Sequence, residues 1–334
     1  MSSTTQVTNF QDLYTDLLNR VRDSTTVAGT LVWAKRYINT ALHDMHINPG
    51  NNFIWQQRRG TLITHAPYTT GTLAISSSAR TTVTGTGTAW NTAVTGFGFN
   101  NARAGGKLEI GSSSEIYTVS TVSSDTALTL ESMYTGDTIT GQSYTYFEDE
   151  YALASDFVRP LDFNLFSSDW NIPIVGAMDF RRASVRNAIR GRPRSACFIQ
   201  LDYSGSTAQR PRVVLSPVPD DEYAIPYWYY TSNLAVSSAG VAQAALSADS
   251  DEPIVPLRFR HALVFHALYH WYRDYKDDVR SGEAKAEYTD IMTRALGDKW
   301  SGEQRAQLIP MTRGGRRLRS RFDSGNGRWD RMEY

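Results

Sequence analysis

The chain has 334 residues and is 41% hydrophobic, so it is long enough to build two or three domains with cores of their own. Lys plus Arg and Asp plus Glu both number 34, and this zero net charge argues against a dedicated nucleic-acid binder, which usually carries a basic surplus. A single cysteine, Cys197, excludes an intramolecular disulfide.

The first residues, MSSTTQVTNFQDLYTDLL, lack the basic and apolar regions of a signal peptide. The chain contains no apolar run that approaches the roughly 18 residues needed to span a bilayer. We therefore expect a soluble protein that is made in the cytoplasm and does not enter a membrane.

Residues 1–65 are predicted to supply the N-terminal helical part of a bundle. One stripe of apolar residues follows Asn9, a candidate N-cap, and a second stripe follows Gly29. Asn48-Pro49-Gly50 ends the second helix, because proline and glycine both disfavour helix there. The two stripes are formed by Phe10, Leu13, Tyr14, Leu17, Leu18 and Val21, and by Leu31, Ala34, Ile38, Ala41, Leu42 and Met45.

Residues 66–147 differ in composition and are predicted to form an inserted all-β module, either Ig-like or a small barrel. Between Ala66 and Tyr146 only eight of 81 residues are charged, and Ser, Thr and Gly fill the segment. Short alternating runs separated by turn residues are typical of such a module, and they argue against disorder. The runs cover residues 73–75, 81–85, 107–110, 115–119, 127–130 and 143–146.

Residues 148–252 are predicted to form a central, mostly β region. The first part, residues 151–165, is interpreted as a strand end followed by a helical or turn segment, and residues 236–252 as a linker. Strands are expected over 196–203, 212–217 and 224–233. Pro217, Pro219 and Pro226 place them at sheet edges or strand starts, because proline donates no hydrogen bond to a sheet.

Residues 253–300 are predicted to be a C-terminal helical hairpin that completes the bundle. Pro256 suits a first helical turn, and the first helix runs from Leu257 to about Val279. Ser281-Gly282 is expected to break it before a second helix over 283–299. The fold class is therefore α+β, with the β segments as excursions from a bundle of N- and C-terminal hairpins.

Three histidines of the first C-terminal helix are candidate metal ligands. His266 and His270 are spaced i,i+4, which can grip a metal ion, and His261 lies nearby. Ala267 occupies the place of the glutamate of helical zinc proteases, and no other Cys or His cluster completes a ligand set. Packing or capping is favoured for these histidines, and for His43 and His46.

The remaining chemical motifs are weak. Cys197 lies in a predicted strand as a small hydrophobe, and the glycines of residues 83–90 are interpreted as turn residues because no helix follows them. The acids Asp220-Asp221-Glu222 and Asp249–Glu252 lie in predicted loops. With no nucleophile elbow, Walker loop or dinucleotide fingerprint, we expect no enzyme, no cofactor and no metal.

Residues 301–334 are predicted to form an Arg-rich docking arm, with a solvated free end as the alternative. Residues 311–334 contain seven arginines and three acids, a local charge of +4. Arginine binds carboxylates through two hydrogen bonds, and aromatic side chains anchor interfaces. The predicted docking residues are Arg313, Arg316, Arg317, Arg319, Arg321, Phe322, Arg328, Trp329, Arg331 and Tyr334.

The order of these segments resembles the head-to-tail adaptor (neck, or head-completion) proteins of tailed bacteriophages. The resemblance rests on LYTDLLNRVRD and LVWAKRYINTALHDM, on YALASDFVRPLDF and GRPRSACFIQL, and on VVLSPVPDDEYAIPYWYY. It continues through VPLRFRHALVFHALYHWYRDYKDD and KAEYTDIMTRAL. The insert, with VTGTGTAWN and IYTVSTVSSDTALTL, is similar to a β module grafted onto many phage structural proteins.

The resemblance implies a structural virion protein at the neck, assembled in the host cytoplasm. It would form a homo-oligomeric ring of twelve copies under the portal protein, extend the DNA channel and offer a downstream tail or nozzle protein its attachment site. Double-stranded DNA would pass during ejection without sequence-specific binding.

Two other functions stay open. One is a different phage neck or tail component, such as a stopper, a tail-tube protein or a fibre-attachment protein. The other is a glycan-binding module on the β insert, because sugars stack on aromatic rings such as those of Trp90, Tyr117, Tyr134, Tyr144 and Tyr146. For these five rings a core position is favoured.

Overall fold

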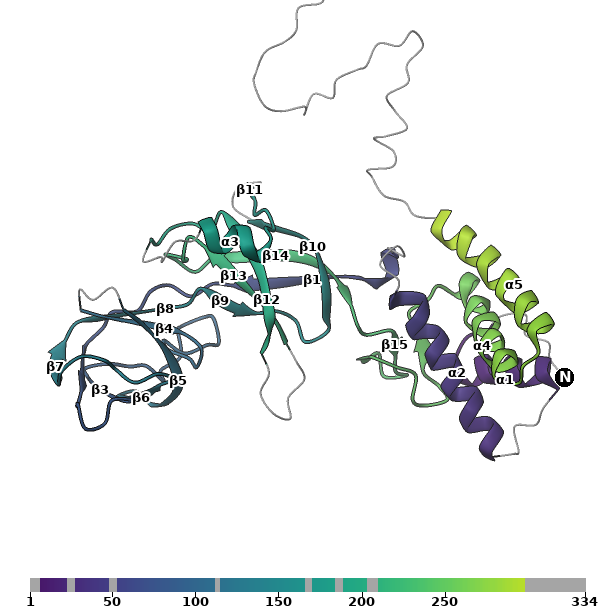
Figure 1. The fold of residues 1–334 in the computed structure, drawn as a ribbon, viewed down its shortest axis with the longest axis horizontal. Helices are drawn as coiled ribbons and strands as arrows, with labels where there is room; N and C mark the ends of the chain where they lie inside the picture. The colour runs from purple at the N-terminus through teal and green to yellow at the C-terminus, as the bar shows by residue number, and fades with distance from the viewer. Residues whose placement is uncertain are drawn as a thin grey trace, which may run out of the picture. The chain divides into compact units, whose positions relative to one another are not determined.

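A computed structural model describes most of the chain and divides it into two compact units (Figure 1). The helical unit comprises Met1–Gln56 and Leu234–Tyr334, and the β unit comprises Gln57–Asn233. The described residues are 7–22, 28–47, 53–111, 115–165, 170–183, 189–202 and 210–297. Each unit is considered by itself below. Among the described residues, none of the helices combines the length and the apolar character needed to cross a membrane.

In the part of the helical unit that the structure describes there are four α-helices, which are α1, α2, α4 and α5. Helix α1 begins with a capping box, in which Asn9 Oδ1 accepts from the Asp12 amide at 2.9 Å and Asp12 accepts from the Asn9 amide at 3.3 Å. The predicted N-cap is therefore confirmed. The elements of the unit are α1 Phe10–Val21, α2 Ala28–Ile47, η1 Ile54–Gln56, β15 Ala235–Val236, β16 Ala242–Gln243, β17 Glu252–Pro253, η2 Leu257–Phe259, α4 His261–Asp274 and α5 Asp278–Gly297.

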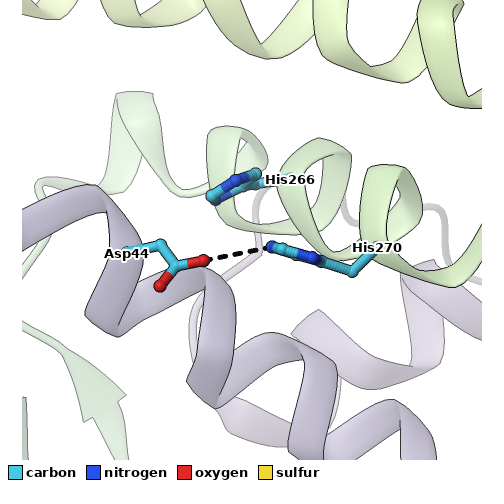
Figure 2. A group of neighbouring side chains, drawn as sticks. All are labelled: Asp44, His266 and His270. Carbon is cyan, nitrogen blue, oxygen red and sulfur yellow. Dashed lines mark ion pairs between the residues drawn. The ribbon is translucent and has the colours of Figure 1, made fainter. Parts of the chain in front are cut away.

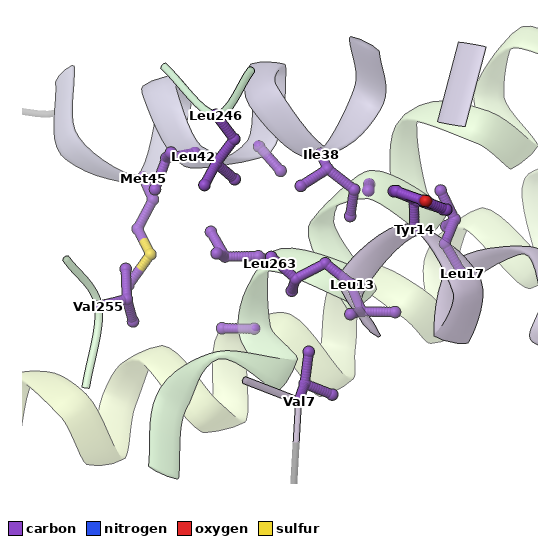
Figure 3. Packing of buried hydrophobic residues seen from close by; sticks show 14 of the residues in the cluster. Val7, Leu13, Tyr14, Leu17, Ile38, Leu42, Met45, Leu246, Val255 and Leu263 are labelled. Carbon is purple, nitrogen blue, oxygen red and sulfur yellow. The ribbon is translucent and has the colours of Figure 1, made fainter. Parts of the chain in front are cut away.

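One hydrophobic core is shared by the helices from both ends of the chain. Helix α4 contacts α1, α2 and α5, and side chains such as Leu13, Ile38 and Leu263 meet in the centre with no exposed surface (Figure 3). Both predicted N-terminal stripes face this core. Burying such stripes against helices far away in the sequence stabilises them more than helix propensity does. The finer prediction, a bundle of two hairpins, stays a prediction.

The predicted helix break at Ser281-Gly282 is wrong, because both residues lie inside α5. Helix α4 ends at Asp274, where Lys276 adopts a left-handed conformation with φ of 58°. The Lys276 amide donates to the Arg273 carbonyl and the Asp277 amide to the Tyr272 carbonyl, which together form a Schellman motif. Asp277 then accepts from the Arg280 amide at 3.2 Å and so caps α5.

Residues 236–252 are more than the predicted linker. They supply strands of a small sheet in the order β16-β15-β17, and Leu246 is buried in the helical core. The carbonyls of Asp251 and Asp249 accept hydrogen bonds from Phe10 and Gln11 at the start of α1. These contacts join segments far apart in the chain, so the composition of the segment does not reveal them.

The β unit contains a curled seven-stranded half-barrel with strand order β7-β2-β3-β6-β5-β4-β8. Every alternating run predicted for residues 66–147 lies within or overlaps one of its strands, while β7 was not predicted. Its core is closed by Trp90, Leu108 and Tyr146. The strands are β2 Thr72–Ile75, β3 Thr82–Thr86, β4 Lys107–Ile110, β5 Ile116–Ser124, β6 Ala127–Leu130, β7 Ile139–Gln142 and β8 Tyr144–Phe147.

Two further sheets complete the β unit, with the orders β1-β14-β10-β11 and β12-β13-β9. A second core, which includes Leu62, Tyr151 and Ile225, belongs to these sheets. Their elements are β1 Gln57–Ile63, β9 Glu150–Ala152, β10 Phe157–Leu165, β11 Trp170–Asn171, α3 Ala177–Ala183, β12 Ser195–Asp202, β13 Arg210–Ser216 and β14 Ala224–Thr231.

The strand end predicted at the start of residues 151–165 is β9, and the helical or turn segment predicted after it is only a short turn at Ser155-Asp156, because β10 occupies the rest. Antiparallel pairing of β10 with β14 decides its conformation, which local sequence does not show. Pro160 lies next to a register shift, and β11 pairs with β10 farther along, at Asn164 and Leu165. Pro226 lies near the start of β14, one residue before its pairing with β10 begins, as predicted for a strand start.

Candidate functional site

The predicted docking residues lie outside the described part of the chain. All ten, from Arg313 to Tyr334, follow residue 297, where the described structure ends. The docking arm therefore stays a prediction.

A group of polar side chains lies where α2 meets α4 in the helical unit. Asp44 extends from α2, while His266 and His270 lie one turn apart on the same face of α4 (Figure 2). One ligand atom from each of the three residues lies within 4.8 Å of the other two. We call these residues the His–Asp cluster.

Neighbouring apolar residues hold the His–Asp cluster in place. On α2, Ala41 and Met45 flank Asp44 and are fully buried, and on α4 Ala267 is fully buried between the two histidines. The His266 ring stacks on Tyr288 of α5, with 4.3 Å between ring centroids and 13° between planes. Packing thus fixes both helices, and the polar side chains share the interface that results.

Charge and burial favour neutral histidines in the cluster. Asp44 Oδ2 lies 3.2 Å from His270 Nε2, and His270 is 8% exposed. Burial, together with the neighbouring His270, lowers the pKa of His266 to about 4. Burial and Arg273 also lower the pKa of His270, although Asp44 acts in the opposite direction. A neutral imidazole keeps a lone pair that can bind a metal ion or accept a proton.

His46, on the same helix as Asp44, shows how a satisfied buried histidine differs. Its Nδ1 lies 2.7 Å from the Leu42 carbonyl, and its Nε2 accepts from the Trp55 indole at 3.2 Å. By contrast, His266 Nδ1 and His270 Nε2 are buried without a hydrogen bond of good geometry among the described residues. These two ring nitrogens of the cluster can therefore still bind a ligand.

Sequence reasoning found the i,i+4 pair of histidines but missed Asp44. The expectation that these rings line a packed interface agrees with their position between α2, α4 and α5. Asp44 was missed because no sequence pattern shows that α2 packs on α4. His43, in contrast, is exposed, and His261 Nδ1 lies 3.7 Å from Asp16 Oδ2.

A family model described as SU10 adaptor protein matches residues 114–319, which is more than half of the chain. The chain belongs to the SU10 adaptor family. This is a family of phage adaptor-type structural proteins and not an enzyme family. No curated protein matches the chain.

The match to the SU10 adaptor family begins next to β5 and extends beyond α5. It therefore includes the central sheets apart from β1, and the C-terminal helices, and the resemblance seen in the sequence also covers these segments. Helices α1 and α2 and the first half of the seven-stranded sheet lie outside the matched residues. The similarity of the insert to a widespread phage β module stays a prediction.

Other candidates from the sequence have structural roles in this member of the SU10 adaptor family. Cys197 is buried in β12. In residues 83–90 no helix follows the glycines, and a Cβ on Gly85 would lie 2.1 Å from Thr88 Oγ1. Asp220 accepts from the Tyr223 hydroxyl at 2.7 Å. None of these contacts forms a nucleophile or a phosphate-binding loop.

The aromatic residues of the insert mostly close its core. Trp90, Tyr117, Tyr144 and Tyr146 are at most 4% exposed, and Tyr134 packs against the same cluster. The Trp90 indole donates to the Tyr144 hydroxyl at 2.8 Å. Because sugars stack on exposed ring faces, these rings do not provide a glycan-binding surface.

Proposed function

We propose that this SU10 adaptor-family chain is a virion protein of the head–tail junction that forms a homo-oligomeric ring under the portal protein. The ring would extend the DNA channel and provide the attachment site for a downstream tail or nozzle protein. The observation that supports this most is the family match over residues 114–319. Twelve copies per ring, with assembly in the host cytoplasm, are part of the proposal.

The helical unit has a surface suited to contact between copies. Val32 is 65% and Trp33 49% exposed on α2, and Trp33 stacks on Tyr37 with ring centroids 6.0 Å apart. The Arg36 guanidinium lies 5.2 Å from the centre of the Trp33 ring. Tryptophan and arginine are enriched at protein interfaces. In the proposed ring, the helices of neighbouring copies pack together as bundles around the channel.

Passage of DNA requires weak attraction between the channel and the phosphate backbone. Binding to DNA grows steeply with the number of phosphates that a protein neutralises. A chain with equal numbers of acidic and basic residues has no overall excess of positive charge. This balance supports a role in which DNA slides through during ejection without sequence-specific binding.

The test of this proposal is assembly with the portal protein. We expect native mass spectrometry to detect a complex of portal and adaptor, and negative-stain images to show a ring of adaptor beneath the portal. If the chain does not bind portal but binds tail tube or fibre, it is one of the other neck or tail components. A ring with another copy number corrects only the twelve-fold symmetry.

The docking-arm prediction has its own test. Deleting residues 311–334 should leave a folded protein that no longer binds portal, because the arginines and aromatic anchors are gone. Circular dichroism checks folding, and co-sedimentation with portal measures docking. As a matched pair, all seven arginines are changed to Lys or to Gln. Loss with both changes indicates bidentate recognition, whereas loss with Gln alone indicates charge. Undiminished binding by the deletion refutes the arm.

A further inference from the structure

We propose that Asp44, His266 and His270 bind a divalent transition-metal ion, such as Zn²⁺, which joins α2 to α4. Two imidazoles and one carboxylate are a ligand set that zinc uses when a fourth position holds water. The site depends only on residues of the helical unit, so it stands apart from the proposed ring.

The distances in the cluster suit a small ion. Tetrahedral zinc with bonds of about 2.0–2.1 Å places its ligand atoms about 3.3–3.4 Å apart. Asp44 Oδ2 and His270 Nε2 are already 3.2 Å apart, and the three ligand atoms lie within 4.8 Å of one another. A rotamer adjustment of His266, whose ring lies beside His270, closes the remaining gap.

The nature of the ligands selects the class of ion. Imidazole suits Zn²⁺, Co²⁺, Ni²⁺ and Cu²⁺, whereas Mg²⁺ and Ca²⁺ prefer oxygen ligands. The two histidines supply nitrogen, and the side chain of Asp44 supplies the negative charge. Because that side chain is 38% exposed, an ion and its water ligand can enter from solvent.

Coordination would also satisfy ring nitrogens that the fold leaves without a well-formed hydrogen bond. Leaving a buried polar atom without one is destabilising, and natural cores contain few such atoms. Among the described residues His266 Nδ1 has no hydrogen-bond partner, and His270 Nε2 lies 3.2 Å from Asp44 Oδ2 without hydrogen-bond geometry. His46, in the same unit, has a partner for each ring nitrogen.

A metal ion at this site would stabilise the native helical unit. Asp44 lies on α2 and the histidines on α4, more than 200 residues later in the chain. The unfolded chain does not hold these three residues together, so binding favours the folded state. At an ion concentration 100-fold above Kd, we expect the Tm of the helical unit to rise by about 5–10 °C.

The experiment uses the full chain with added Zn²⁺, Co²⁺ or Mg²⁺. We expect Zn²⁺ and Co²⁺ to raise the Tm, Mg²⁺ to leave it unchanged, and Co²⁺ to show the visible absorption bands of low-symmetry coordination. EDTA should reverse these effects. Absence of the Co²⁺ bands together with absence of a Zn²⁺ shift overturns the proposal.

Variants locate the site. His270→Gln and Asp44→Asn should each weaken Zn²⁺ binding at least about 100-fold, because losing even an outer-shell partner costs about 10–100-fold. His261→Gln, on the same helix but outside the cluster, should bind as the parent does. Circular dichroism shows whether each variant is folded. If His270→Gln folds and binds Zn²⁺ with unchanged affinity, the proposed site is wrong.

Discussion

Glu148 of the β unit and the His–Asp cluster of the helical unit differ in how completely their buried polar atoms are hydrogen-bonded. In the β unit, both carboxylate oxygens of Glu148, which is 5% exposed, are used. Oε1 accepts from Arg103 Nε at 2.9 Å and from the Tyr146 hydroxyl at 2.6 Å, while Oε2 accepts from Arg103 Nη2. In the helical unit, His266 Nδ1 has no hydrogen-bond partner among the described residues, and His270 Nε2 lies 3.2 Å from Asp44 Oδ2 without hydrogen-bond geometry.

This comparison between Glu148 and the His–Asp cluster distinguishes buried polar groups with a structural role from buried polar groups that can still bind a ligand. A buried network in which each member has a partner specifies one packed arrangement. A buried nitrogen without a partner costs free energy unless a ligand supplies one. Glu148 is therefore interpreted as part of the architecture of the β unit, and the His–Asp cluster as the place in the helical unit that a ligand can use.

The largest effect on stability is expected when a substitution removes Arg260 from its hydrogen-bond network in the helical unit. Arg260, 8% exposed, donates to the carbonyls of Val255 and Pro253 at 3.0 and 3.2 Å, and also to the Thr8 carbonyl. We expect Arg260→Met to lower the free energy of unfolding of this unit by about 3–5 kcal/mol, because buried acceptors lose their donor. Urea unfolding followed by circular dichroism at the helical minimum measures this.

Arg294→Met is the matched control for Arg260→Met. Arg294 pairs with Asp290 on the surface of α5, and its side chain is 70% exposed. Such pairs contribute less than about 0.5 kcal/mol. If both substitutions have equal effects, Arg260 does not hold the N-terminal segment to the C-terminal part of the unit.

The second largest effect is expected when the hydrogen-bond network around Glu148 in the β unit is weakened. Glu148→Gln keeps the volume of the side chain but removes the charge that Arg103 binds. We expect a loss of about 2 kcal/mol, because charge-assisted hydrogen bonds are stronger than neutral ones. Hydrogen exchange should show faster opening of the strands near Tyr146 and unchanged protection in α4. Equal loosening of α4 would show that the two units do not respond independently.

A smaller effect depends on pH and concerns Asp251. Burial raises the pKa of Asp251, but hydrogen bonds from Ser247 and Ala248 outweigh it and lower the pKa overall. The ionised form is thus favoured in the folded state, so its contribution is present above about pH 4 and is lost as pH falls further. The parent should exceed Asp251→Asn by about 1 kcal/mol at pH 7. Thermal unfolding at a series of pH values should show the difference shrinking below pH 4, and a constant difference contradicts this.

The smallest effect is expected when most of the half-barrel is removed. Deleting residues 70–146, with the ends bridged, should leave the circular dichroism signal of the helical unit intact, since the two units are compact separately. In the remaining β part, Glu148 loses Arg103, and Arg190 loses Glu109, its partner at 2.7 Å. Loss of the helical signal would contradict the separation of the units.

Sequence periodicity was enough to predict the four helices described in the helical unit and about half of the strands, but it did not predict α3 or β1. The stripe from Phe10 to Leu18 and the alternation in residues 127–130 follow local spacing, which each element imposes on its own buried face. The same local rule failed for β10, whose strand conformation depends on pairing with β14, and for β7, whose burial is weak. Helix propensity also missed the end of α4 at Asp274, two residues before Lys276 adopts a left-handed conformation.

The sequence by itself determined which local elements this protein forms and which family it resembles. It supplied the two kinds of unit and the segments of a phage adaptor, and it paired His266 with His270 through helical spacing. Only the tertiary structure brought Asp44 to these histidines and Arg260 to Thr8, because each contact joins residues more than 200 positions apart. Local spacing carries no information about such contacts. They arise when two apolar helix faces bury each other and fix which polar side chains share the interface.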